Sequence, residues 1–589
     1  MKNAVKVKMV GWYNPIQLLR TASEVLISTI FGKHADRRLI EALTDSSDLN
    51  QKLYYDFSNE NKKEMWFDYI SDVGDGFDST YTMAYYLARP QLSFPLLDND
   101  QITYSTNQGD ILIFGGDEVY PTASMKTYNE RLIKPYKAAY ARKDSVVPSI
   151  FAIPGNHDWY DSLVAFSRIF CEGRKFFGSK SLQNRSYFAL KLINGWWLFG
   201  TDMQLGSALD TPQIGYFTEV MKKLAPDDRI ILCNAEPHWL YSTLYKNDPA
   251  FDNRNMGFFE GHVLQNRVAV YIAGDRHYYR RHEDPKTGKQ KITAGGGGAF
   301  LHPTHNENVA RIGNRDLYDL RASFPDSKTS EKLGWRNLLF PLINPWFGII
   351  TAVLYLLTAR AFLSDLGKFG LSDIFQALGV IVHDALVQPI SLYWGLAIFV
   401  GFLVFTDTYS RWYRLIAGPL HGITHLTAVF LISWAASYFV SSGRGLDFAS
   451  NAQLLTTALL ILIGGYVIGS LIMGVYLFVS LNFFGRHHNE AFSSLKIADY
   501  KNFLRLKIEE NGDLIIYPIG VRRVAGKWRD NSDLRSDSRI VPDDPRATIP
   551  ELIEEPITIA MSNNNLRNDK SWDSNSNTIA FDGRIKSLE

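Results

Sequence analysis

Residues 454–484 contain no Asp, Glu, Lys or Arg side chain. An α-helix needs about 20 apolar residues to cross a hydrocarbon core roughly 30 Å thick, and this run is longer than that. Three further apolar segments precede it, at residues 338–358, 390–406 and 415–440. Buried core helices are the alternative interpretation, but they do not account for so long a run without a charge. We therefore predict that residues 337–485 form a transmembrane bundle of about four helices in a lipid bilayer.

Basic residues beside these segments predict which way the bundle faces. Lys332, Arg336 and Arg486 flank it on the side of the two soluble parts, and Arg411 and Arg414 lie between the second and third segments. Because Lys and Arg accumulate in cytoplasmic loops, this bias places the N-terminal half and the C-terminus in the cytoplasm. We expect an integral, multi-pass membrane protein.

The length and the net charge of the chain limit the number of domains and the kinds of partner that can be expected. A chain of 589 residues is too long for one compact core, and its 62 Lys and Arg residues nearly balance its 61 Asp and Glu residues. Without a net positive field, no nucleic acid duplex is expected as a partner. Cys171 and Cys233 form neither a CxxC pair nor a disulfide framework, which is compatible with a reducing compartment.

Short apolar runs in the first half predict buried strands. They lie at residues 111–114, 149–153, 197–200, 230–233 and 268–272, and polar helical stretches separate them. Each run ends in a loop rich in Gly, Asp, Asn or His. Because α/β proteins place their chemistry at the carboxyl ends of strands, we predict an α/β sandwich with a site on these loops.

Five loops carry side chains that suit metal ions. In chain order these side chains are Asp72 and Asp75, Asp117, Asn156 with His157 and Asp158, Glu236 with His238, and Asp275 with Arg276 and His277. Carboxylate, amide oxygen and imidazole are ligands of divalent metals. Two ions about 3.5–4 Å apart can share one carboxylate, hold phosphoryl oxygens and convert water into hydroxide. The loops therefore predict a site for two divalent metal ions that hydrolyses phosphoesters.

The motifs Gly116-Asp117 and Gly155-Asn156-His157-Asp158 resemble those of the calcineurin-like metallophosphoesterases. The resemblance covers roughly residues 66–305. It implies a four-layer αββα sandwich, which we assign to residues 61–330.

The resemblance also implies roles for single residues. Asp72 and His277 would bind the first metal, Asp117 would bridge both, and Asn156 would bind the second. His157 would lie over the phosphate and assist departure of the leaving oxygen. Asp158 would orient the His157 ring.

Three positions depart from the family pattern. Gly74 stands where the family has His, and Asp275 replaces the first His of its final Gly-His-x-His motif. Glu236, or alternatively His238, fills the fourth loop. The resulting oxygen-rich ligands favour Mn²⁺ or Mg²⁺ over Zn²⁺. Asp75 or a water molecule would supply the ligand that the first site lacks.

Two of these loop residues are expected to contact substrate. Arg276 would clamp its phosphate, and His238 is the second candidate contact. The substrate is a phosphate mono- or diester at the cytoplasmic membrane surface, and lipid-linked, nucleotide and phosphoprotein esters all stay open.

The ends of the chain complete the predicted organisation. Residues 1–60 are interpreted as a helical segment, residues 486–528 as a β-rich segment, and residues 529–589 as a largely disordered tail rich in Asp, Asn and Ser.

Other functions stay open beside the hydrolase. The missing histidines favour a degenerate phosphoesterase domain that acts as a ligand sensor or scaffold for the bundle, whereas the intact His157 argues against it. A transporter regulated by the soluble domain is a third hypothesis, which the few charges in the spans disfavour. His421 and His425, four residues apart in the third segment, could bind a metal, but interhelical hydrogen bonding is favoured.

Overall fold

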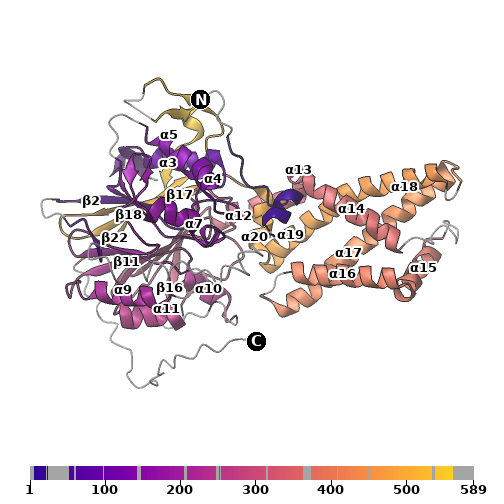
Figure 1. Ribbon diagram of the computed structural model, residues 1–589, viewed down its shortest axis with the longest axis horizontal. Helices are drawn as coiled ribbons and strands as arrows, with labels where there is room; N and C mark the ends of the chain where they lie inside the picture. The colour runs from indigo at the N-terminus through magenta and orange to yellow at the C-terminus, as the bar shows by residue number, and fades with distance from the viewer. Residues whose placement is uncertain are drawn as a thin grey trace, which may run out of the picture.

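The computed structural model describes residues 6–561, except residues 22, 24–51, 59–61, 97–98, 142–146, 204–208, 247, 249–250, 252–253, 314–315, 363–372, 407–408, 448–449 and 534–537. Figure 1 shows a globular part that contains the β-sheets and a bundle of long helices that projects from one side of it.

Two large sheets form the globular part. In the seven-stranded sheet, β2 (Met65–Ile70), β5 (Ile111–Phe114) and β6 (Ser149–Ala152) run parallel, with Phe67 opposite Ile111 and Ile113 opposite Phe151. The nine-stranded sheet has the order β1 (Tyr55–Asp56), β9 (Phe188–Lys191), β10 (Trp196–Gly200), β11 (Arg229–Asn234), β12 (Val268–Ala273), β14 (Gln290–Ala294), β13 (Tyr279–Glu283), β16 (Tyr318–Phe324), β15 (Arg311–Ile312).

Apolar side chains hold these sheets face to face. Residues such as Phe67, Ile113 and Phe151 from one sheet pack with Leu198 and Ile272 from the other in a continuous buried cluster. Helices α3 (Phe77–Leu87) and α5 (Lys134–Ala139) cover the outer face of the smaller sheet. Helices α9 (Thr211–Met221), α10 (His238–Leu244) and α11 (Arg254–Phe258) cover that of the larger one (Figure 1). The predicted αββα sandwich is confirmed.

The end of the chain completes the smaller sheet. Strand β17 (Lys501–Ile508) pairs antiparallel with β2, and β18 (Leu514–Val521), β21 (Pro550–Leu552) and β22 (Ile557–Ile559) follow it outward. The predicted β-rich segment at residues 486–528 contains β17 and β18, but it is not a unit of its own, because both strands belong to the sandwich. The predicted disorder of the tail is wrong for the described residues 529–533 and 538–561, where Ile540, Val541 and Ile559 are buried. Residues 562–589 lie outside the described residues.

The helical bundle contains α14 (Pro345–Phe362), α15 (Ile374–Val387), α16 (Pro389–Phe405), α17 (Arg411–Tyr438), α18 (Asn451–Gly464) and α19 (Ser470–Phe484). Among the described residues, three helical stretches, 345–362, 411–443 and 451–484, are long and apolar enough to cross a membrane. The second predicted span, residues 390–406, corresponds to α16, an apolar helix of 17 residues.

The N-terminal segment joins the sandwich to the bundle. Residues 6–10 form neither helix nor strand, and the Val10 N–H group donates to Asp75 Oδ1 at 2.7 Å. A helix follows at residues 15–21, drawn in indigo beside α13 (Phe340–Ile343) and α20 (His488–Leu495) in Figure 1. Between them, the Tyr13 ring packs on Phe340 at 5.0 Å and its hydroxyl donates to the Glu490 carbonyl at 3.1 Å. The predicted helical segment 1–60 is thus helical only in part and includes β1; residues 24–51 are outside the described residues.

Candidate functional site

Turns after three parallel strands bring the predicted carboxylates together. Asp72 follows β2, Asp117 follows β5 and Asp275 follows β12 of the other sheet. All three have left-handed backbone conformations, with φ of 58°, 54° and 64°. A non-glycine residue with positive φ is uncommon, and such residues cluster at functional sites. The turns therefore bring the Asp72 and Asp117 side chains together where the two sheets meet. Asp275 lies beside them: its backbone N–H donates to Asp72 Oδ2 at 2.9 Å, and its carboxylate accepts from the Tyr241 hydroxyl.

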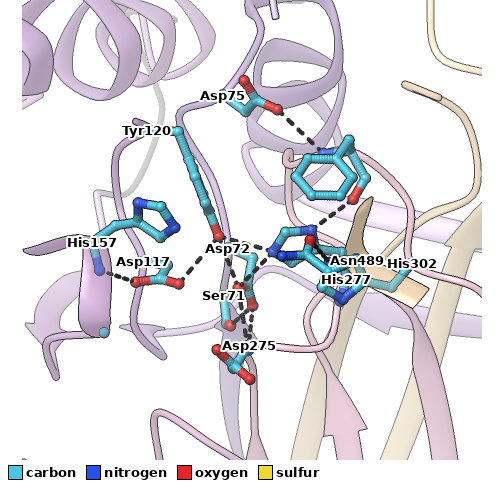
Figure 2. A network of polar contacts seen from close by, with 12 residues as sticks. Ser71, Asp72, Asp75, Asp117, Tyr120, His157, Asp275, His277, His302 and Asn489 are labelled. Carbon is cyan, nitrogen blue, oxygen red and sulfur yellow. Dashed lines mark hydrogen bonds and ion pairs between the residues drawn. The ribbon is translucent and has the colours of Figure 1, made fainter. Parts of the chain in front are cut away.

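The Tyr120 hydroxyl lies at the centre of this place (Figure 2). It is 3.0 Å from Asp72 Oδ1, 3.2 Å from Asp117 Oδ2 and 3.0 Å from His277 Nε2. The His277 Nε2 atom is itself 3.4 Å from Asp72 Oδ1. His277 uses Nδ1 to donate to the Phe300 carbonyl at 2.7 Å, so in the neutral imidazole Nε2 is an acceptor and one phenolic proton faces three acceptors. A buried cluster with more acceptors than protons is deficient in positive charge.

Sequence reasoning missed Tyr120. Its position in the sequence could have indicated it. Tyr120 lies three residues after Asp117 in the same loop, close enough for its phenol to reach the ends of the strands. The structure also explains why no histidine stands at Gly74. That residue has φ of +69°, and a Cβ atom there would lie 2.2 Å from the Glu118 carbonyl oxygen. A histidine side chain therefore does not fit at position 74. The Tyr120 phenol lies beside Asp72 instead.

The carboxylates raise one another's proton affinity. Burial and the neighbouring Asp72 and Asp158 carboxylates raise the pKa of Asp117 well above its usual value. Burial and Asp72 raise the pKa of Asp275 to about 6. Burial and the nearby Asp117 carboxylate also raise the pKa of the Tyr120 phenol. Each shift is what a cation in the cluster would reverse.

His157 lies beside this cluster on the short helix α6 (Asn156–Trp159). Its backbone N–H donates to Asp117 Oδ1 at 2.8 Å, and its ring lies 4.3 Å from the Tyr120 ring between centroids. Because a carbonyl oxygen can only accept, the 2.6 Å contact with the Pro121 carbonyl assigns the proton to Nδ1 and leaves Nε2 as the lone-pair nitrogen. Burial lowers the pKa of His157 to about 4.

Asp158 does not have the predicted role of orienting His157. One of its oxygens accepts from the Gly155 N–H at 2.9 Å and from the Glu118 N–H at 3.3 Å, and the other accepts from the Tyr128 hydroxyl. Asp158 therefore shapes the turn that carries Asn156 and His157, and the Pro121 carbonyl orients the imidazole.

Asp75 and His238, two other predicted site residues, form their hydrogen bonds with groups outside the cluster. Both oxygens of Asp75 accept backbone N–H groups, from Val10 and Phe300, so Asp75 ties the N-terminal segment down. His238 is buried between Asn234, at 3.2 Å, and Glu260, at 3.0 Å. These contacts do not support the predicted roles of Asp75 as a metal ligand and His238 as a substrate contact.

Two further predicted ligands lie at the edge of the site. Glu236 follows β11 and is half-buried, and Asn156 opens α6 with its side chain on the Tyr160 hydroxyl. Their roles as ligands stay predictions.

The Arg276 side chain is positioned by contacts with Tyr241 and Glu307. Its guanidinium lies 5.0 Å from the centre of the Tyr241 ring and 3.8 Å from Glu307, which also pairs with Arg280. Burial opposes ionisation of Glu307, but Arg280 and Arg276 lower its pKa to about 2.

This depressed pKa predicts an acid sensitivity. Glu307 stabilises the fold fully above its unfolded pKa, near 4.5, and this contribution is lost as the pH falls from about 5 to about 2. We expect the free energy of unfolding of the wild-type protein to fall more steeply over this range than that of Glu307→Gln, measured by urea denaturation at each pH. Equal slopes would show that the pairing of Glu307 does not contribute.

The donor atoms suit a hard divalent cation. Within the described part of the chain, no three His, Cys, Asp or Glu side chains form a ready metal-binding group, and the Tyr120 hydroxyl lies among Asp72, Asp117 and His277. Carboxylate and phenol oxygens with one imidazole are nevertheless ligands that such ions accept. The backbone carbonyl that fixes the tautomer of His277 is the support that metal-binding histidines usually have.

Comparison with protein families agrees with this fold. Residues 65–279 match the family model described as calcineurin-like phosphoesterase. No curated protein matches the sequence significantly. Among solved structures, GAP50, the anchor in the inner membrane complex of Plasmodium, shares 14% identity over 45% of this chain and 84% of its own, with a TM-score of 0.30.

Two further solved structures are similarly distant. Purple acid phosphatase PPD1 from yellow lupin (Lupinus luteus) seeds shares 15% identity over 45% of this chain and 49% of its own, with a TM-score of 0.31. PhoD shares 13% identity over 45% of this chain and 63% of its own, with a TM-score of 0.27. At these values the likenesses carry no argument, and the assignment rests on the family match. Residues 65–279 therefore form a calcineurin-like phosphoesterase domain, the domain of a phosphoric ester hydrolase.

Proposed function

We propose that this protein hydrolyses phosphate mono- or diesters at a membrane surface, with divalent metal ions bound where Asp72, Asp117, Tyr120 and His277 meet. The observation that carries the proposal is the shortage of protons around the Tyr120 hydroxyl, which faces three acceptors at 3.0–3.2 Å. Asn156, Asp275 and Glu236 are proposed as ligands of a second ion. The oxygen-rich set favours Mn²⁺ or Mg²⁺.

Metal ions bound there would polarise the phosphoryl group and acidify water. The chain's own residues would do the rest. The His157 Nε2 atom, held by the Pro121 carbonyl on the opposite side of the ring, is proposed to contact the ester and pass a proton to the leaving oxygen. A bound phosphate would favour the protonated imidazole, because an opposite charge nearby raises a histidine pKa. Arg276, anchored by Glu307, is proposed to bind a non-bridging phosphate oxygen.

The membrane position is part of the proposal. Three helical stretches of sufficient length and apolarity support it. Strand β17 follows the bundle in the chain and pairs with β2, which precedes it. This pairing supports placing both soluble parts on one face of a bilayer, with α16 as the fourth span. The basic residues near the helix ends favour the cytoplasmic face.

Activity with a generic substrate tests the proposal. Detergent-solubilised protein, stripped of metal by a chelator, is assayed on an aryl phosphate monoester and diester after separate addition of Mn²⁺, Mg²⁺ and Zn²⁺. We expect turnover to return with Mn²⁺ or Mg²⁺, and His157→Ala to lower kcat by about 10²–10⁴-fold without loss of metal binding. Metal binding without turnover under any condition would instead favour a sensor.

The variant Tyr120→Phe tests whether the Tyr120 hydroxyl is a metal ligand. Removal of the hydroxyl keeps the ring packed on His157 but takes one oxygen from the cluster. We expect metal affinity, measured by calorimetry, to fall by about 10–100-fold, the scale seen when groups supporting a metal site are removed. Tyr160→Phe, which removes a hydroxyl next to Asn156, is the matched control and should change affinity less. Equal affinities of wild-type protein and Tyr120→Phe would exclude the phenol as a ligand.

A further inference from the structure

A cavity in the helical bundle extends to Trp12, which lies against His157 of the proposed site. It has a volume of about 640 Å³ and lies between α14, α16 and α17, with the N-terminal segment and α20 at its end nearest the sandwich. Cavities of roughly 300–1,000 Å³ are the usual size of sites for small ligands. The cavity is therefore large enough for a ligand.

The side chains that line the cavity are mostly apolar and suit a hydrocarbon chain. Among the described lining residues, Glu490 is the only charged one, and its carboxylate pairs with His487 at 3.5 Å. The polar groups deeper in the cavity also have internal partners. The Tyr355 hydroxyl contacts His425 Nδ1 at 2.8 Å, and the Trp394 indole N–H donates to the Thr358 hydroxyl at 3.0 Å. The interior of the cavity thus offers apolar surface and few free donors.

Trp12 connects this cavity to the site. Its side chain lines the cavity and also lies against His157, with 6.0 Å between ring centroids, and against Phe300, at 6.2 Å. Phe300 is the residue whose carbonyl holds His277. Among the described residues, the buried Trp12 indole N–H has no hydrogen-bond acceptor. An unpaired donor thus lies where the apolar cavity meets the catalytic residues.

The length of the cavity matches half a bilayer. Along α14 it is lined from Phe347 to Thr358, a distance of about 16 Å at 1.5 Å per residue. One leaflet contributes roughly half of a 30 Å hydrocarbon core. A chain that enters beside Trp12 can therefore lie within the bundle over the depth of one leaflet.

We propose that this cavity binds the hydrocarbon chain of a lipid phosphoester, whose phosphate is thereby held at the site of Asp117 and His157. This inference rests on the proposed function and names its substrate class. The chain fills the space between α14, α16 and α17, the Trp12 N–H donates to an oxygen next to the phosphate, and the ester bond reaches His157.

Gly401 offers a way to fill the cavity without a clash. It lies on α16, lines the cavity, and a Cβ atom there would meet no other atom within 4 Å. Gly379 on α15 likewise has no atom within 4 Å of a Cβ position, but it is not among the lining residues. Gly401→Phe and Gly379→Phe are thus a matched pair, and Ala397→Phe is a second cavity-filling variant.

The experiment compares a two-carbon and a twelve-carbon alkyl ester of the same phosphate, assayed as monomers in the presence of activating metal. Because each buried methylene contributes up to about fourfold, we expect kcat/KM of the wild-type protein to be at least about tenfold higher for the long ester. Gly401→Phe and Ala397→Phe should lower this long-to-short ratio at least about fivefold, and Gly379→Phe should leave it unchanged. Using the ratio separates loss of chain binding from poor folding, which lowers both values together.

The outcomes separate the two proposals. Normal turnover of the short ester with no chain preference, or with the same ratio in Gly401→Phe, would overturn the lipid inference alone. So would a nucleotide or a phosphopeptide hydrolysed at least tenfold more efficiently than the long ester. Failure to hydrolyse either ester with any metal would instead contradict the proposed function, and with it this inference.

Discussion

Replacing Arg505 by alanine is expected to lower the free energy of unfolding of the sandwich by about 3–5 kcal/mol, as for other broken buried ion pairs. Arg505 on β17 is fully buried, and its Nε donates to Asp68 Oδ1 on β2 at 2.9 Å. A second guanidinium nitrogen donates to the Leu87 carbonyl at 3.1 Å. The alanine variant leaves the Asp68 carboxylate buried without its cation, in the strand that leads into Asp72.

The control for this variant lies in the same terminal segment. Arg522 pairs with Glu551 at 2.5 Å, but its side chain is 63% exposed. Arg522→Ala should cost less than about 1 kcal/mol, because exposed ion pairs contribute little. Both variants are measured by urea unfolding of the full chain in detergent, with tryptophan fluorescence as the signal. Equal stabilities of the two variants would mean that the terminal strands are not an integral part of the catalytic domain.

Asp117→Asn is expected to have opposite effects on activity and stability. The change removes the carboxylate proposed to hold the metals, so kcat should fall by about 10³-fold or more. In metal-free protein the same change removes a buried group whose pKa is raised by burial and by Asp72 and Asp158. The melting temperature of the metal-free variant should therefore rise by roughly 2–4 °C, which corresponds to about 1 kcal/mol for a domain of this size.

Asp110→Asn provides the comparison for this variant. Asp110 precedes the same strand, is 42% exposed at its side chain and pairs with Lys62 at 2.6 Å. This variant should change neither activity nor stability appreciably. If Asp117→Asn lowered stability and activity together, the cluster would be a structural network and not a strained binding site.

The sequence predicted the parts of the site that follow from local order. Apolar runs such as residues 111–114 are continuous because both faces of a central strand are buried, and Asp117 follows directly. The two sheets and their helical layers could be predicted in the same way. The long apolar helices were also visible, because a helix that faces lipid needs no alternation of polar residues.

Other parts depend on contacts distant in sequence. The pairing of β17 with β2 joins residues more than 400 positions apart, and no periodicity reports such a partner. The sequence of the terminal segment predicted disorder because its strands are short and the residues between them are mostly polar. Only a few of its residues, such as Ile540 and Ile559, are buried. Tyr120 was missed since a tyrosine in a turn is usually structural, and only the folded chain brings its hydroxyl to Asp72 and His277.

The most direct test of the proposed metal site is anomalous X-ray scattering from crystals of the full chain equilibrated with Mn²⁺. We predict an anomalous peak within ligand distance of Asp72, Asp117, Tyr120 and His277, with a second peak about 3.5–4 Å away towards Asn156 and Asp275. The same peaks should be lost in Asp117→Asn. Absence of a peak at this position at saturating Mn²⁺, or a peak elsewhere only, would contradict the account.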